Sequence, residues 1–71
     1  MKEYNYYMYL QYWRKKANLT QMQVAIELNT TPHQLSRYEN GTRELPIHQA
    51  VKMCKLYNVS LDELYLGKGV D

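Results

Sequence analysis

The chain has 71 residues, a net charge of +2, 45% hydrophobic residues, and only three glycines and two prolines. This composition indicates one small folded domain rather than a largely disordered chain, and we expect no second domain. No run of about eighteen apolar residues and no signal peptide is present, so we expect neither membrane spanning nor export. Cys54 is alone and cannot form an internal disulfide, which fits a cytoplasmic protein.

The first predicted helix covers residues 6–17, with Asn5 as its N-cap and Asn18 as a left-handed residue that ends it. Its apolar positions follow helical spacing: Tyr6, Leu10, Trp13 and Ala17. The same segment carries more tyrosines than one small core can take: Tyr4, Tyr7, Tyr9 and Tyr12. We expect these rings to cover the flank of the domain. An interface with a second protein chain is an alternative, because aromatic residues are enriched in interface cores, and contact with a membrane surface is a third.

Two short helices are predicted within residues 20–41, each beginning with the sequence of a capping box. In a capping box a threonine oxygen accepts from an early backbone N–H, and the glutamine three residues later reaches back. Thr20 with Gln23 fits this pattern, and so does Thr31 with Gln34. Pro32 follows at the first helical position, where its missing N–H costs nothing. A helix therefore starts near residue 21 and another at residue 32.

The turn between these helices is short, and each helix has one apolar stripe. Residues 28–30 form the turn, with Asn29 in the left-handed conformation, and the pair Asn40–Gly41 ends the second helix. The expected buried positions are Val24, Ala25, Leu28, Leu35 and Tyr38. The outer face of the second helix is polar and carries Pro32, His33, Gln34, Ser36 and Arg37. A surface of this kind can read base edges in the major groove of duplex DNA.

Two further helices are expected after a polar loop, which completes an all-α domain of five helices over residues 6–66. The fourth helix opens at Pro46 and runs to about Tyr57, and its expected apolar stripe is Ile47, Ala50, Val51, Cys54 and Tyr57. Asn58 ends it, and Val59 fills the core. Ser60 with Glu63 forms a third capping box, for a short helix through Tyr65. We expect residues 1–5 to form an N-terminal arm and residues 67–71 a flexible tail.

Nearly the whole chain, from Tyr6 to Leu66, resembles the Cro and phage-repressor type of helix-turn-helix proteins, also called the xenobiotic-response-element family. The segments that carry the resemblance are LQYWRKKANLTQMQVAIEL, LSRYENGTRELP and KLYNVSLDEL. The resemblance implies a compact five-helix domain that binds duplex DNA through its third helix, usually as a two-fold dimer, and regulates transcription. Two positions depart from the family pattern: Asn29 replaces the usual turn glycine, and Pro32 replaces a base-reading polar residue.

The resemblance also implies roles for individual residues. Gln21 matches the glutamine that contacts a phosphate and braces the recognition helix. Arg14 and Glu39 match a semi-buried ion pair between the first and third helices. The positions that face bases or flanking phosphates are Thr31, Pro32, His33, Gln34 and Arg37, and the loop that holds the DNA strand contributes Asn40, Thr42 and Arg43. Ser36, on the same helix face, completes the expected DNA-binding set.

Three of these residues have a second interpretation. Arg37 either contacts guanine or phosphate, or it is an ordinary solvated arginine. The side-chain amide of Gln34 can bond either to the backbone, in the capping box, or to an adenine. His33 can contact a phosphate, a base or neither, and it lacks the spacing to His48 of a metal-binding pair.

We expect a sequence-specific transcriptional regulator. The leading hypothesis is a repressor of a phage, plasmid or bacterial operon that binds double-stranded DNA as a homodimer. The expected dimer surface is Leu61, Tyr65 and Leu66. The alternative is a protein-interaction module, such as an antitoxin or anti-regulator, that holds a protein partner through the tyrosine-rich first helix. No catalytic motif is present, so we expect no enzyme, no cofactor, no metal and no small-molecule inducer.

Overall fold

The computed structural model describes residues 6–70, and this part of the chain folds into five α-helices without a strand. The helices are α1 (Tyr7–Lys16), α2 (Gln21–Glu27), α3 (Pro32–Asn40), α4 (Ile47–Tyr57) and α5 (Leu61–Leu66). The all-α prediction is therefore confirmed. Asn5 and Tyr4 lie outside the described residues, so their expected roles remain predictions.

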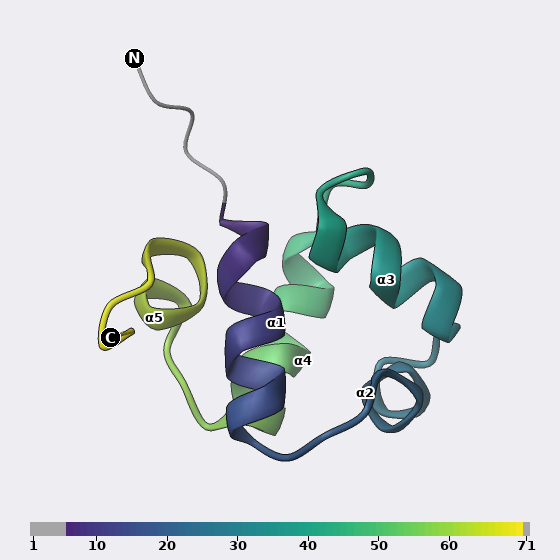
Figure 1. Ribbon diagram of the computed structural model, residues 1–71, viewed down its shortest axis with the longest axis horizontal. Coiled ribbons are helices and arrows are strands. Elements are labelled where there is room, and N and C mark those ends of the chain that lie inside the picture. Colours follow the sequence, from purple (N-terminus) through teal and green to yellow (C-terminus); the bar gives the residue numbers. More distant parts are fainter. Residues whose placement is uncertain (1–5, 71) are drawn as a thin grey trace.

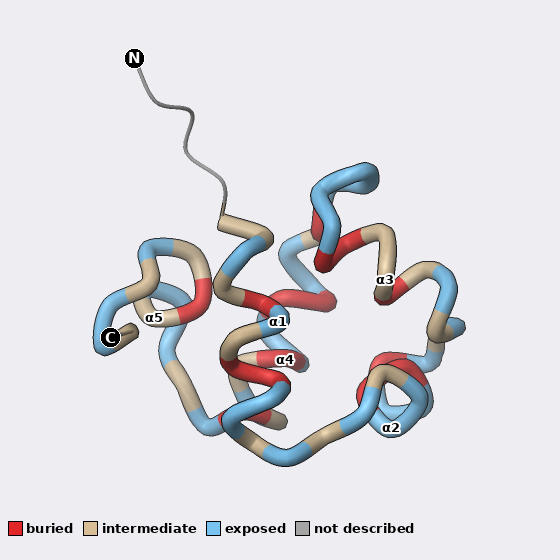
Figure 2. The backbone as a smooth tube through the Cα atoms, in the orientation of Figure 1, coloured by how far each residue is buried: buried red, intermediate tan, exposed pale blue. Residues whose placement is uncertain are grey.

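Helix α1 lies in the middle of the domain, with α2 and α3 on one side, α5 on the other and α4 behind it (Figure 1). The buried stretches of the helices point into the space that they share (Figure 2). This core contains Leu10, Trp13, Val24, Leu28, Leu35, Tyr38, Leu45, Ala50, Met53, Tyr57 and Leu64. Helix α1 thus joins the α2–α3 pair to α5. None of the helices in residues 6–70 is long and apolar enough to cross a membrane.

Helices α1, α2 and α4 each end near an asparagine whose backbone is in the left-handed conformation. Asn18, Asn29 and Asn58 have φ angles of 60°, 57° and 59°, and they follow α1, α2 and α4 as the sequence predicts. Asparagine tolerates this conformation better than other residues with a side chain. The N–H groups of Leu19, Thr30 and Val59, one position further on, donate to carbonyls in the last helical turn at 2.9–3.1 Å. These bonds satisfy carbonyls that would otherwise lack a partner, so the chain turns sharply after each helix.

Two tyrosines of α1 cover the glycines that end α3 and α5. Gly41 has φ 83°, and a Cβ atom there would lie 2.6 Å from the ring of Tyr7. Gly67 has φ 70°, and a Cβ atom there would clash with the ring of Tyr9. Both tyrosines are half-buried. This part of the tyrosine cluster therefore covers the domain flank, as expected.

The predicted stripe of α4 is partly wrong. Ile47 and Val51 are 61% and 40% exposed, whereas Met53 is fully buried. The inward face is instead Gln49, Ala50, Met53 and Tyr57. The helix is rotated relative to the expectation because α1, α2 and α5 pack around it, and they cover a different side from the one with the most apolar side chains.

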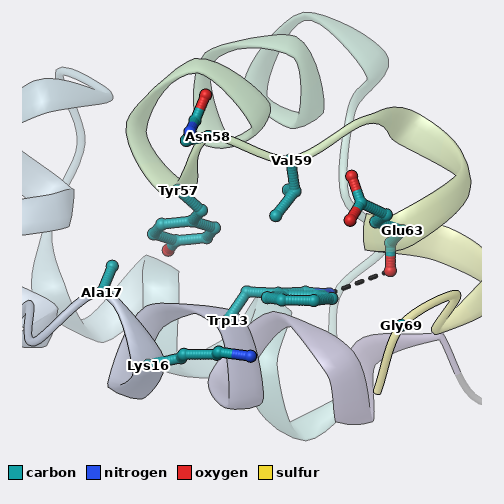
Figure 3. Close-up of a pocket in the computed structure, with 8 residues that line it drawn as sticks. All are labelled: Trp13, Lys16, Ala17, Tyr57, Asn58, Val59, Glu63 and Gly69. Atoms are coloured by element: carbon teal, nitrogen blue, oxygen red, sulfur yellow. Dashed lines mark hydrogen bonds between the residues drawn. The ribbon is translucent and has the colours of Figure 1, made fainter.

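Trp13 connects α1 to α5 and to the residues that follow it. Its indole Nε1–H donates to the carbonyl of Glu63 at 2.9 Å. Beside the ring is an open hollow of about 280 Å³, and in Figure 3 Lys16 lies on one side of the Trp13 ring while Tyr57 and Val59 lie on the other. Val70 packs partly against the core. The flexibility expected of residues 67–71 stays a prediction, and Asp71 lies outside the described residues.

Candidate nucleic-acid interface

The starts of α2 and α3 are capped differently. At α2 the capping box is complete: Gln23 N–H donates to Thr20 Oγ1 at 3.1 Å, and Thr20 N–H donates to Gln23 Oε1 at 2.8 Å. At α3 only the first half forms, with Gln34 N–H donating to Thr31 Oγ1 at 3.1 Å. The amide of Gln34 instead donates to the hydroxyl of Tyr38 at 3.5 Å. The predicted second capping box is thus wrong in its reciprocal bond, because the amide lies along the helix.

A buried polar network fixes the inner side of α3. Arg14 donates from Nε to Glu39 Oε2 at 2.6 Å and from Nη2 to Glu39 Oε1 at 3.1 Å. The third bond of this guanidinium goes from Nη1 to the carbonyl of Leu19 at 2.9 Å. Gln21 Nε2 donates to Glu39 Oε1 at 3.0 Å. Arg14 and Glu39 are 7% and 8% exposed, so one carboxylate holds α1 and α2 against the end of α3.

Gln49 is a positioning residue that sequence reasoning did not find. It is buried on α4, and its Nε2 donates to the carbonyl of Leu28 at 3.2 Å, at the turn between α2 and α3. The bond holds one carbonyl of that turn. The only signal in the sequence is a polar residue beside Ala50, and this gives no indication of burial.

The outer side of α3 presents the polar residues that the sequence places there. We call Pro32, His33, Gln34, Ser36 and Arg37 the α3 outer face. His33 is exposed and the other four are half-exposed, while Leu35, Tyr38 and Glu39 of the same helix point inward. Thr31, before the helix, is exposed. Within residues 6–70, the side chains of His33 and Arg37 make no hydrogen bond or ion pair, so the imidazole and the guanidinium are available to a ligand.

The loop after α3 is built on the backbone of Arg37. Its carbonyl accepts from the N–H groups of Thr42 at 3.0 Å and Arg43 at 3.2 Å. Asn40 Oδ1 accepts from Thr42 N–H at 3.0 Å and from Thr42 Oγ1–H at 2.7 Å. These bonds leave the Nδ2 donors of Asn40 and the exposed side chain of Arg43 directed to solvent. Asn40 and Arg43 thus keep donors for an anion, whereas the Thr42 hydroxyl proton is already used.

The residues expected at a dimer surface lie away from α3. Leu61 and Leu66 are 41% and 62% exposed, and Tyr65 is half-buried. The ring of Tyr65 packs against that of Tyr6 with centroids 4.9 Å apart. In Figure 1, α5 and α3 lie on opposite sides of α1.

The buried Tyr57 and the half-buried Cys54 have shifted pKa values, and neither lies on the α3 outer face. Burial, with a smaller contribution from Glu39, raises the pKa of Tyr57 far above its usual value of 10.0, while Arg14 acts in the other direction. Burial also raises the pKa of the Cys54 thiol, helped by Glu63. Within residues 6–70, no cluster of three or more His, Cys, Asp or Glu side chains is arranged to hold a metal ion.

Helices α2 and α3 are joined by a short turn, and together they define a helix-turn-helix domain. The outer side of α3 is polar, and its inner side is held by the Arg14–Glu39 pair. Residues 10–64 match the family model described as helix-turn-helix. The chain belongs to this family, in its Cro/C1-type branch. It is also 44% identical over 55 residues to the HTH-type transcriptional regulator ImmR of Bacillus subtilis (strain 168).

The alignment with ImmR covers 78% of this chain and 42% of ImmR. The chain therefore corresponds to less than half of that relative's length. No solved structure gave a significant match.

Proposed function

We propose that this chain binds duplex DNA through the α3 outer face and represses a phage, plasmid or bacterial operon. The observation that carries the proposal is the contrast between the two sides of α3. Its inner side is held by Leu35, Tyr38 and the buried Glu39 carboxylate, and its outer side bears polar groups with few protein partners. A helix fixed in this way can present its side chains to base edges without reorganising.

Arg37 is the residue expected to contribute most to base reading. Its backbone is fixed by the loop bonds, and its guanidinium has no partner within residues 6–70. A guanidinium can donate two bonds to O6 and N7 of guanine. Gln34 is the next candidate, because its bond to Tyr38 is 3.5 Å long and thus easily exchanged for a bond to adenine.

Phosphate contacts complete the proposed interface. Gln21 contacts Glu39 in the last turn of α3, and Asn40 and Arg43 follow directly, so the three proposed phosphate donors lie near the C-terminal end of α3. The net charge of +2 is too small to give strong binding by charge alone. Specific contacts must therefore supply most of the affinity. ImmR is named as a transcriptional regulator, which supports the regulatory part of the proposal.

A dimer is part of the proposal, with Leu61, Tyr65 and Leu66 as its surface. Two copies would read half-sites about one helical turn, roughly 34 Å, apart. Sedimentation with and without DNA tests this, and a monomer at high micromolar concentration in both experiments would contradict it. The alternative of a protein partner held by the tyrosines of α1 is less well supported, because Tyr7 and Tyr9 cover glycines of their own domain.

The test of DNA binding is selection of bound duplexes from a random library at physiological salt. We expect the parent chain to enrich a two-fold motif. Arg37→Ala should lose about 1 to 3 kcal/mol of discrimination at one base position of each half-site. Lys68→Ala, which removes an exposed cation outside the proposed interface, is the matched control and should enrich the parent motif. No enrichment by the parent chain would overturn the proposal.

A further inference from the structure

A shallow groove runs between α2 and α4, and none of its residues belongs to the proposed DNA interface. It consists of two adjoining hollows of about 300 and 280 Å³, which share Glu27 and Leu56 as lining residues. We define the α2–α4 groove by Leu19, Ile26, Glu27, Lys52, Lys55 and Leu56. It requires no contribution from the α3 outer face, so both surfaces can be occupied at once.

The floor of the groove is apolar. Leu19 and Leu56 are half-buried and pack against the core. Ile26 is 66% exposed on α2, on the other side of the helix from the buried Val24 and Ala25. The neighbouring Met22 is 57% exposed. A single exposed apolar residue needs no explanation, but Ile26 lies beside the two partly exposed leucines of the same hollow, and together they form a continuous apolar surface.

The rim of the groove is basic. Lys52 and Lys55 are three residues apart on α4, so both project from the same side of the helix. Neither lysine forms an ion pair in the described part of the chain. Glu27 is the one acidic lining residue, and the two lysines minus this carboxylate leave a charge of +1. A ligand that fits this groove therefore has an apolar face beside negative charge.

We propose that the α2–α4 groove binds an amphipathic helix of another protein, with an apolar face on Leu19, Ile26 and Leu56 and acidic residues beside Lys52 and Lys55. A groove between two helices is a common binding site for such a helix, whose anchor residues lie at i, i+3, i+4 and i+7. The apolar floor does not suit a phosphate backbone.

The proposal is tested with two synthetic helical peptides of eighteen residues and the ¹⁵N-labelled full chain. The first peptide has leucine at the four anchor positions and glutamate on both flanks, and the second has lysine in place of each glutamate. We expect the acidic peptide to shift backbone amide signals in residues 19–27 and 52–56 and to bind about five- to tenfold more tightly than the basic one.

Three variants make the test specific. The double variant Lys52→Glu/Lys55→Glu should reverse the preference between the peptides. Ile26→Gln should weaken both peptides, and because Ile26 is exposed the fold should persist. Lys68→Glu changes an exposed lysine outside the groove and should bind like the parent. Equal binding of the two peptides, or signal shifts confined to other residues, would overturn the proposal. Shifts in the groove that follow protein concentration without peptide would also overturn it, in favour of a second copy.

Discussion

Trp13 and Arg14 are neighbours in α1, yet they hold opposite sides of the domain by different chemistry. Arg14 binds the Glu39 carboxylate of α3 with two hydrogen bonds of 2.6 and 3.1 Å. Trp13 donates one bond of 2.9 Å to a backbone carbonyl of α5 and otherwise makes ring contacts, including an edge contact with Tyr12. In Figure 1, α3 and α5 accordingly lie on either side of α1.

The difference shows how one helix can supply two kinds of attachment. A bidentate arginine–carboxylate pair has a narrow range of favourable geometries, so the Arg14–Glu39 pair sets the orientation of α3. Aromatic packing contributes mainly through buried area and tolerates small changes in angle. We therefore expect damage on the Arg14 side to affect the position of the α3 outer face, and damage on the Trp13 side to affect stability alone.

The largest expected effect is on the Arg14 side. Glu39→Ala should lower the free energy of unfolding by about 3 to 5 kcal/mol, because it leaves the Arg14 guanidinium buried and unpaired. Urea unfolding followed by circular dichroism measures this loss. Glu44→Ala, at an exposed carboxylate in the neighbouring loop, is the matched control and should change stability by less than about 0.5 kcal/mol.

A second variant separates the unpaired charge from the loss of packing. Arg14→Met combined with Glu39→Leu removes both charges, so its loss should be smaller than that of Glu39→Ala. A loss below about 1 kcal/mol for Glu39→Ala alone would contradict the ion pair as the main attachment of α3.

An intermediate effect is expected on the Trp13 side. Trp13→Phe should lower the free energy of unfolding by about 1 to 3 kcal/mol, because the indole bond and part of the buried ring are lost. The affinity of the folded protein for its selected DNA should stay at the parent value. Gln21→Ala is the contrasting variant, expected to weaken DNA binding with a loss of stability of about 1 kcal/mol. If Trp13→Phe weakened DNA binding as much as Gln21→Ala, the two sides of α1 would not be separable.

The smallest effect at neutral pH is expected at Tyr57, which lies in the electrostatic field of the Arg14–Glu39 pair. Its hydroxyl is buried and makes no hydrogen bond within the described residues. Tyr57→Phe should therefore change the free energy of unfolding at pH 7 by less than about 1 kcal/mol.

At alkaline pH the Tyr57 variant should differ from the parent. Because burial raises the pKa of Tyr57 in the folded state, the unfolded chain loses this proton first, starting near pH 10. The Tyr57 contribution is thus fully present below pH 10 and is lost as the pH rises through the folded-state pKa. Urea midpoints from pH 7 to pH 11 should fall less in Tyr57→Phe than in the parent. Parallel curves for the two proteins would exclude this contribution.

Local sequence determined where the helices begin and end. Thr20 and Ser60 form capping boxes with residues three positions later, and Asn29 and Asn58 adopt left-handed angles. These features involve atoms only a few residues apart, so they can be derived from the chain alone. The polar outer side of α3 could be derived in the same way, because helical spacing separates it from Leu35 and Tyr38.

Only the tertiary structure decided which side of each helix faces a neighbour. The apolar residues of α4 are spread over too much of its circumference for spacing to select the inward side, so the sequence predicts a buried Ile47 and does not predict a buried Met53. Likewise, Gln34 bonds along its helix rather than back to the cap, and Gln49 holds a turn carbonyl 21 residues away in sequence. The physical reason is that these choices depend on the shapes and polar groups of helices distant in the chain, whereas caps and turns depend on neighbouring residues.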